Sequence, residues 1–145
     1  MHINQLSESY SVASQILVED VATILDAGFK SIICNRPDEE NPMHCQIKAI
    51  RTAAQAAGLE FAENSFDSYS FGLDKVQRQT LLLKQLPSPV LAYCASGNRC
   101  CVIWAYSFAG TLEINAILQA TTHAGYQLSH LRPQLEHSAL SHRAG

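Results

Sequence analysis

The chain has 145 residues, of which 47% are hydrophobic and 16% charged, and its formal net charge is −3. This composition predicts one folded domain spanning 1–145 and excludes the charge-rich, weakly hydrophobic character of a disordered chain. Because the chain has no excess of positive charge with which to neutralise phosphates, we expect no nucleic acid among its partners.

The first residues lack the basic start and apolar run of a secretion signal. The longest apolar stretch, 100–105, is far shorter than the roughly 20 residues that a membrane span needs. We therefore expect no membrane association and a cytoplasmic location. The cysteines form no CxxC pair, which favours reduced thiols over disulfides or zinc, so no metal and no cofactor is expected. They are Cys34, Cys45, Cys94, Cys100 and Cys101.

The first third of the chain predicts short strands before and after a helix. Residues 3–13 alternate weakly in polarity, which indicates one or two short strands at a sheet edge. Hydrophobic residues at helical spacing over 18–25 predict a helix, with Gly28 as its C-terminal cap. A β-branched run at 29–34 predicts a strand that ends in a polar loop, 35–42.

The same order of helix and strand then recurs twice. A helix is expected at 46–57 and a strand at 59–62. Asp74 is expected to cap a helix that continues to Gln85. Residues 90–93 are hydrophobic throughout, as in a parallel strand that is covered on both faces.

Two more helices are expected, from Arg99 to about 108 and from about 111 to 123. Alternating strands and helices predict an α/β fold with a central, mostly parallel sheet flanked by helices. Ligands of such folds bind at the carboxyl ends of the strands, and Cys94 comes directly after the strand at 90–93.

The loop from Cys94 to Arg99 carries the candidate catalytic residues. A cysteine at a helix N-terminus has a lowered pKa and is a nucleophile as its thiolate. Arg99 adds a planar fork that can hold two oxygens of an anion. The alternative is that Cys94 is a structural cysteine and Arg99 merely begins a helix. The residues between them tolerate tight turns whose N–H groups bind anions, and they are Ala95, Ser96, Gly97 and Asn98.

Several segments resemble the phosphatase-like domain family of beta-lactamase hydrolase-like proteins (domain of unknown function 442), relatives of dual-specificity and tyrosine phosphatases. They are Ser-Val-Ala-Ser-Gln at 11–15, Gly-Phe at 28–29, Asn-Arg-Pro-Asp at 35–38 with Glu40, Ala-Gly-Leu at 57–59, Pro-Val-Leu-Ala-Tyr-Cys at 89–94, Ser-Gly-x-Arg at 96–99 and Ala-Gly-Tyr at 124–126. The resemblance implies a protein-tyrosine-phosphatase-like fold, with Cys94 as nucleophile and Arg99 as oxyanion clamp. It also implies hydrolysis of a phosphate monoester, so the expected partner is a small anionic substrate or a phosphorylated molecule.

Departures from the phosphatase pattern favour a second hypothesis. Four residues separate Cys94 from Arg99, one fewer than in tyrosine phosphatases, and this shorter loop resembles that of rhodaneses. Tyr93 stands where tyrosine phosphatases usually have histidine, and Ala95 where the family often has arginine. The alternatives are a rhodanese-type sulfurtransferase that carries a persulfide on Cys94, or a non-catalytic domain that binds an anion in the same loop.

Asp67 is the candidate general acid that a phosphatase needs to protonate the leaving oxygen. It follows the strand expected at 59–62, and its order relative to Cys94 is similar to that in dual-specificity phosphatases. The alternative is an aspartate that only forms a turn. A rhodanese would need no such acid, so removing Asp67 separates the two mechanisms.

Arg36 and Asp38 follow another expected strand and could line the same pocket. Alternatively, Arg36 pairs at the surface with one of the three acids at 38–40. Cys100 lies close enough to act as a resolving thiol for an oxidised nucleophile, or it is a core residue of the helix.

Overall fold

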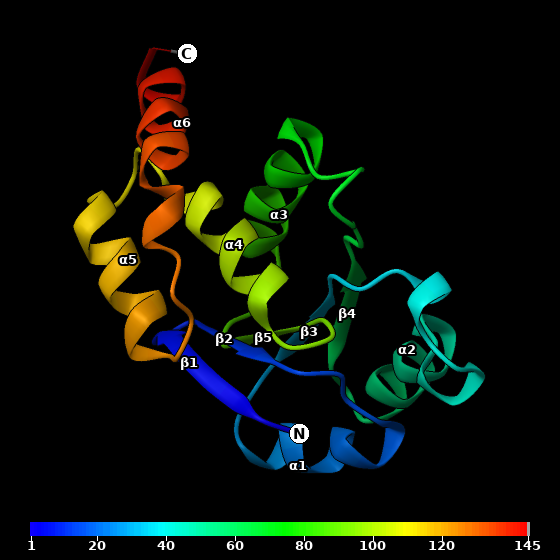
Figure 1. The fold of residues 1–145 in the computed structure, drawn as a ribbon. Helices are drawn as coiled ribbons and strands as arrows, with labels where there is room; N and C mark the ends of the chain where they lie inside the picture. The colour runs from blue at the N-terminus through cyan, green and yellow to red at the C-terminus, as the bar shows by residue number, and fades with distance from the viewer. Residues whose placement is uncertain (145) are drawn as a thin grey trace.

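The computed structural model describes the backbone of residues 1–144 and side chains through residue 141. Its sheet has the strand order β1-β2-β5-β3-β4, in which β1 runs antiparallel to β2 and the other neighbours are parallel (Figure 1). The strands are β1 (Ile3–Ser7), β2 (Tyr10–Ala13), β3 (Ser31–Cys34), β4 (Glu60–Glu63) and β5 (Val90–Tyr93). The helices are α1 (Val21–Asp26), α2 (Ile47–Ala56), α3 (Leu73–Gln85), α4 (Asn98–Phe108), α5 (Ile114–His123) and α6 (Arg132–Ala144). Short 3-10 helices are η1 (Val18–Asp20), η2 (Asp38–Glu40), η3 (Met43–Cys45) and η4 (Ser129–Leu131).

The strand β5 lies at the centre of the sheet because all four of its residues are hydrophobic and can be buried on both faces. Its last residue, Tyr93, is level with Ala13 at the end of β2 and with Cys34 at the end of β3. Cys34 is in turn level with Glu63 at the end of β4. The loops that follow the parallel strands therefore leave from one edge of the sheet, and the Cys94 loop is in the middle of that edge.

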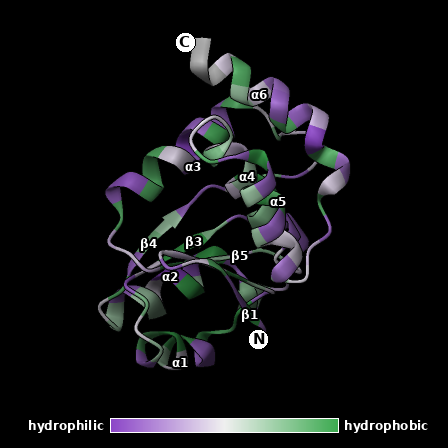
Figure 2. Ribbon diagram, turned by 90° about the vertical axis from the view of Figure 1, so that its left-hand side faces the viewer, coloured by the Kyte–Doolittle hydropathy of each residue, from purple (hydrophilic) through white to green (hydrophobic). Residues whose placement is uncertain are grey.

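The helices cover the two faces of the sheet unequally (Figure 1). One buried cluster joins the sheet to α1 and α2, and a larger one joins it to α3, α4, α5 and α6. Tyr93 belongs to the first cluster and Cys94 to the second, as alternation along a strand requires. Hydrophobic and hydrophilic residues are mixed along the helices (Figure 2), as expected of helices that bury one side in the domain.

A buried polar network fixes the loops beside β5. The Oε1 of Gln79 in α3 accepts hydrogen bonds from Nδ2 of Asn35 (3.0 Å) and Asn64 (2.9 Å). Its Nε2 faces the hydroxyl of Tyr10 (3.4 Å), which donates to the carbonyl of Cys100 (2.9 Å). Leaving one such buried group without a partner costs about 1–3 kcal/mol. The network therefore holds the chain at the ends of β3 and β4 in place.

The predicted α/β fold with a mostly parallel, helix-flanked sheet is confirmed, and some boundaries differ. The prediction that Asp74 caps a helix is wrong, because α3 begins at Leu73 after Gly72 and Asp74 lies within the first turn. There the carboxylate still faces the positive end of the helix dipole. The strand β2 is internal, so on this side of the sheet β1 is the edge.

The helix expected from about 111 begins instead at Ile114. The N–H groups of Thr111 and Leu112 both bond to the carbonyl of Phe108, and this turn separates α4 from α5. The terminal segment, for which no element was predicted, forms α6.

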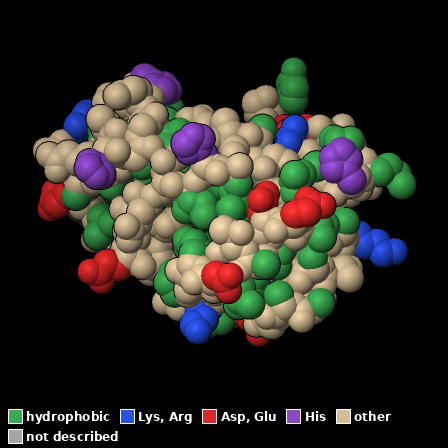
Figure 3. All heavy atoms as spheres, turned by 90° about the horizontal axis from the view of Figure 1, so that it is seen from below, with side chains coloured by type: hydrophobic (Ala, Val, Ile, Leu, Met, Phe, Trp, Pro, Cys, Tyr) green, Lys and Arg blue, Asp and Glu red, His purple; other side chains and the backbone are tan. Residues whose placement is uncertain are grey.

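Within residues 1–144, no helix is both long and apolar enough to cross a membrane. On the face seen in Figure 3, basic and acidic side chains are interspersed.

Candidate active site

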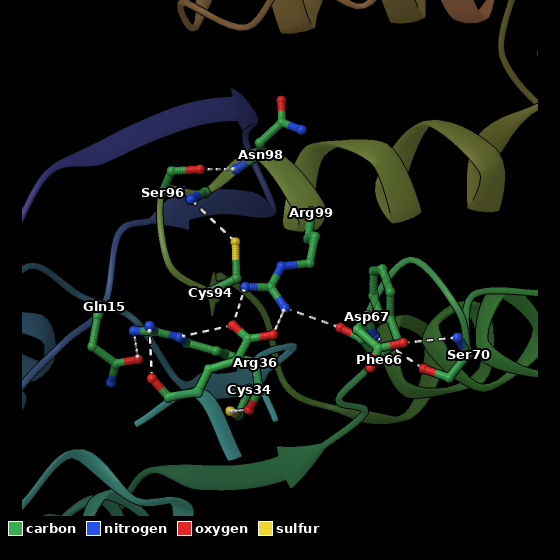
Figure 4. Close-up of polar contacts among 12 residues, drawn as sticks. Gln15, Cys34, Arg36, Phe66, Asp67, Ser70, Cys94, Ser96, Asn98 and Arg99 are labelled. Carbon is green, nitrogen blue, oxygen red and sulfur yellow. Dashed lines mark hydrogen bonds and ion pairs between the residues drawn. The ribbon is translucent and has the colours of Figure 1, made fainter. Parts of the chain in front are cut away.

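Cys94 lies immediately after β5, with 1% of its surface exposed. Its backbone N–H donates to the carbonyl of Ala13 (3.2 Å), which extends the pairing of β5 with β2 by one residue. The backbone then turns away from the sheet into α4, and Gly97 precedes the helix with a φ of +94°. That left-handed conformation allows the Gly97 N–H to point back at the Cys94 Sγ, 3.1 Å away (Figure 4).

Three carbonyl groups of the loop are bonded to partners outside it. Because the C=O and N–H of one peptide point in opposite directions, each bond turns the following N–H away from the bonded partner, and the Gly97 N–H thereby faces the Cys94 Sγ. The bonds run from Gln15 N–H to Ala95 C=O (3.3 Å), from Tyr126 O–H to Ser96 C=O (2.9 Å) and from Cys101 N–H to Gly97 C=O (3.1 Å). The loop is thereby held as a tight turn beside the Cys94 Sγ.

Ser96 and Asn98 are exposed residues that shape this turn. The Ser96 Oγ accepts a hydrogen bond from the backbone N–H of Asn98 (3.3 Å), the first residue of α4. Figure 4 shows the Asn98 side chain directed away from Cys94. These two residues therefore contribute mainly through their backbone and the local turn.

The surroundings of Cys94 stabilise its thiolate. A hydrogen bond from the Cys100 thiol, followed by the backbone N–H groups of Cys100, Ser96 and Gly97, lowers the pKa of Cys94 to about 5 despite burial. Burial, and then the adjacent Cys94, raise the pKa of Cys100 well above the usual range for a thiol, so Cys100 remains a protonated donor. Cys94 is therefore ionised at neutral pH, as a nucleophile must be.

We expect the ultraviolet absorbance of one thiolate to appear between about pH 4 and 6 in the folded protein, because the pKa of Cys94 is about 5. The signal should be lost as the pH falls through this range. The measurement is a difference titration of the wild-type protein against Cys94→Ser. A transition near the pH of an ordinary thiol would contradict the geometry described above.

The guanidinium of Arg99 is held on two sides and open on a third. Nη1 and Nη2 donate to the two carboxylate oxygens of Glu40 (2.9 and 2.7 Å), and Nη1 also donates to the carbonyl of Phe66 (3.1 Å). Among the described residues, Nε–H and the second N–H of Nη2 have no hydrogen-bond partner. These two donors lie in parallel along one edge of the guanidinium, so they form a free fork for two oxygens of an anion.

Glu40 also holds Arg36, so it bridges two arginines. Arg36 Nε donates to Glu40 Oε1 (3.2 Å), and its Nη2 donates to the Glu40 carbonyl (3.2 Å). The third contact of Arg36 is Nη1 to the Oε1 of Gln15 (3.2 Å). Hydrogen bonds from Arg99, and then from Arg36, keep the pKa of Glu40 below its usual range. The structure thus pairs Arg36 with Glu40 of the 38–40 segment. Because Glu40 also binds Arg99, Arg36 helps to hold the carboxylate that positions Arg99.

Asp38 is tied to the helix that follows it. Its Oδ1 accepts the backbone N–H of Ile47 (2.8 Å), the first residue of α2. This bond satisfies one of the free N–H groups of the helix N-terminus. The contact anchors the 38–40 segment, and with it Glu40, against α2.

Asp67 lies beside the site but its carboxylate is occupied in a turn. Its Oδ1 accepts the backbone N–H groups of Tyr69 (2.9 Å) and Ser70 (2.9 Å). The backbone bond from Ser70 is the largest cause of a lowered pKa of Asp67. Figure 4 shows the carboxylate directed toward Ser70, whereas the neighbouring carbonyl of Phe66 is the group that contacts Arg99. These contacts favour the turn-forming interpretation of Asp67.

The other cysteines are buried and lie in the core. Cys100 has no exposed surface and contacts Cys94 from the first turn of α4. Cys34 donates its thiol hydrogen to the carbonyl of Arg36 (3.2 Å). In the described part of the chain, no group of three or more His, Cys, Asp or Glu residues is placed to hold a metal ion.

The sequence alone does not reveal the residues that contact the site from distant positions along the chain. The sequence suggests Glu40 as a partner of Arg36 and as part of a family-like segment, and it suggests Gln15 and Tyr126 only as parts of such segments. Their positions in those motifs were the available signal, but no spacing rule connects them to Cys94. The carbonyl of Phe66 left no signal, because any residue supplies one.

Comparison with known proteins identifies relatives. The model of the family "Beta-lactamase hydrolase-like protein, phosphatase-like domain" matches residues 2–111. Two curated relatives are beta-lactamase hydrolase-like proteins. The one from Xylella fastidiosa is 27% identical over 97% of this chain, and the one from Agrobacterium fabrum is 26% identical over 69%. The matched segments cover 33% and 23% of those relatives, so the chain spans about a quarter to a third of their length.

Solved structures share the fold. The Neisseria meningitidis protein nma1982 superposes with a TM-score of 0.83 at 29% identity, over 95% of this chain and 99% of its own. PTPMT1 superposes with a TM-score of 0.75 at 15% identity, over 99% and 97% of the two chains. Pseudomonas aeruginosa TpbA, solved in complex with pTyr, gives 0.68 at 15% identity, over 99% and 91%. At these lower identities the likeness concerns the fold alone.

Proposed function

Because the chain belongs to the phosphatase-like domain family of beta-lactamase hydrolase-like proteins, we propose that it hydrolyses phosphate monoesters through a covalent intermediate on Cys94. The observation that carries the proposal is the convergence of two features on one loop. The Cys94 Sγ accepts the Gly97 N–H (3.1 Å), and Arg99 holds a free pair of parallel donors at the same loop.

The proposed reaction has two steps. The Cys94 thiolate attacks phosphorus, an S–P bond forms, and the ester P–O bond breaks while the leaving oxygen takes a proton from solvent water. Water then attacks the phosphocysteine, the S–P bond breaks, and inorganic phosphate and the thiolate are released. The loop N–H groups and the Arg99 fork stabilise the negative charge on the equatorial oxygens in both steps.

The substrate class proposed is a phosphorylated molecule, and pTyr bound to the structural neighbour TpbA supports this choice. A second candidate is sulfane-sulfur transfer, because the loop has four residues between Cys94 and Arg99. In that reaction the thiolate would take the outer sulfur atom of thiosulfate, releasing sulfite, and the resulting persulfide would pass that sulfur to cyanide, giving thiocyanate and the free thiolate.

The deciding experiment gives purified protein an aryl phosphate in one assay and thiosulfate with cyanide in another, with the Cys94→Ser protein as blank. Phosphate release supports the proposal. Thiocyanate production without phosphate release overturns it in favour of the sulfurtransferase. If neither product forms although phosphate still binds, the domain is an anion-binding module and the proposal fails.

We expect Asp67→Asn to lower kcat/KM for an aryl and for an alkyl phosphate alike by less than about threefold, because asparagine retains the oxygen that accepts the Tyr69 and Ser70 N–H groups. The measurement compares an aryl with an alkyl phosphate, since only the poorer alkyl leaving group demands protonation. Asp74→Asn is the matched control in the neighbouring helix. A loss of about 100-fold or more confined to the alkyl substrate would establish Asp67 as the general acid after all.

A further inference from the structure

Tyr126 reaches the Cys94 loop from a distant part of the chain. It lies between α5 and η4, outside the 2–111 segment that the family model matches. Its hydroxyl donates to the carbonyl of Ser96 (2.9 Å) and accepts a hydrogen bond from Nδ2 of Asn4 in β1 (3.2 Å). The hydroxyl is therefore fixed from both sides, and its hydrogen is directed at the loop.

The carbonyl that Tyr126 holds belongs to the peptide whose N–H holds the sulfur. The C=O of Ser96 and the N–H of Gly97 are the two ends of one planar unit and point in opposite directions. One end accepts from Tyr126 (2.9 Å), and the other donates to the Sγ of Cys94 (3.1 Å). Rotating this peptide would break both bonds at once.

We propose that Tyr126 is a positioning residue that locks the Ser96–Gly97 peptide so that its N–H stays directed at the Cys94 sulfur. This inference rests on the proposed function in one respect, that the Cys94 sulfur is the reacting atom. Tyr126 acts through the peptide and does not itself contact the thiol.

The packing at Gly97 supports the same role. A Cβ built on Gly97 would collide with the hydroxyl of Tyr126, so the tyrosine side chain lies directly against the backbone of the loop. Gly97 is needed both for its positive φ and for this close approach. Tyr126 thus closes the outer side of the loop that the sulfur occupies on the inner side.

Tyr126 stays a donor over the range in which the thiol titrates. Partial burial raises the pKa of Tyr126 above the ordinary tyrosine value, so the hydroxyl remains protonated when Cys94 ionises. A protonated hydroxyl polarises the peptide in the direction that strengthens N–H donation at its other end.

The test compares the wild-type protein with Tyr126→Phe, which keeps the ring and removes only the hydroxyl. Tyr69→Phe is the matched control, because the Tyr69 side chain is 97% exposed. The readouts are the thiolate absorbance titration, the rate of alkylation at a pH near the Cys94 transition, and kcat/KM for an aryl phosphate. Circular dichroism checks that each variant is folded.

We expect Tyr126→Phe to move the thiolate transition to higher pH and to slow alkylation near the wild-type transition by about three- to tenfold, as loss of one ordinary hydrogen bond would. Tyr69→Phe should leave both unchanged. An unchanged titration in folded Tyr126→Phe overturns the inference, even if phosphate release falls. A shifted titration supports it even if the wild-type protein releases no phosphate, a result that would overturn only the proposed function.

Asn4→Ala provides a second variant should Tyr126→Phe not fold. It removes the bond that orients the hydroxyl and leaves the tyrosine in place. We expect a smaller shift in the same direction, about twofold in the alkylation rate. A titration indistinguishable from wild type would then overturn the inference.

Discussion

Replacing Cys94 by serine is expected to abolish phosphate release, with a loss in kcat/KM of at least about 10³-fold. The site lowers the pKa of the Cys94 thiol to about 5. A serine hydroxyl starts from a pKa so much higher that the same donors leave it protonated and weakly nucleophilic. The near-identical size of the two side chains leaves the buried position at the end of β5 packed.

Phosphate release from an aryl phosphate measures this effect, and inorganic phosphate binding is measured beside it. Cys45→Ser is the matched control, since Cys45 is also buried but lies in η3 rather than in the loop. Binding of phosphate to Cys94→Ser should persist, because the loop N–H groups and Arg99 remain. Retention of a tenth or more of the wild-type activity would show that Cys94 is not the nucleophile.

The centre of the site could be predicted because its signals are local. A hydrophobic run at 90–93, a turn-forming loop and a helix follow one another directly, and this order puts Cys94 and Arg99 at the carboxyl edge of a parallel sheet. The conformation of the loop backbone then determines which N–H groups face the sulfur. The structure agrees, with Gly97 in the left-handed conformation that the turn needs.

The supports of the site could not be predicted, because each comes from far along the chain. Glu40 contacts Arg99 across 59 positions, and Tyr126 contacts Ser96 across 30. No period or spacing encodes such contacts, which depend on how α2 and α5 pack on the sheet. Asp67 shows the converse limit, since its residue type suits both an acid and a turn, and only its hydrogen bonds distinguish the two.

Arg99→Lys is expected to lower kcat/KM for an aryl phosphate by about 10²- to 10³-fold, although the positive charge is kept. Lysine offers a single point of charge. It lacks the planar fork that binds Glu40 along one edge while leaving two parallel donors free along another. Steady-state kinetics measure the effect, and a loss below about fivefold would mean that charge alone suffices.

Glu40→Gln tests whether Glu40 must orient the Arg99 guanidinium. Glutamine loses the charge and one of the two oxygens that receive Arg99, so we expect a loss of about tenfold in kcat/KM, with Glu39→Gln on the same 3-10 helix as the neutral control. If Glu40 acts only by orienting Arg99, its substitution should cost little more once Arg99 is already lysine, and the two losses should be strongly non-additive. Fully multiplicative losses would instead mean that Glu40 contributes independently, through Arg36 or the fold of the 38–40 segment.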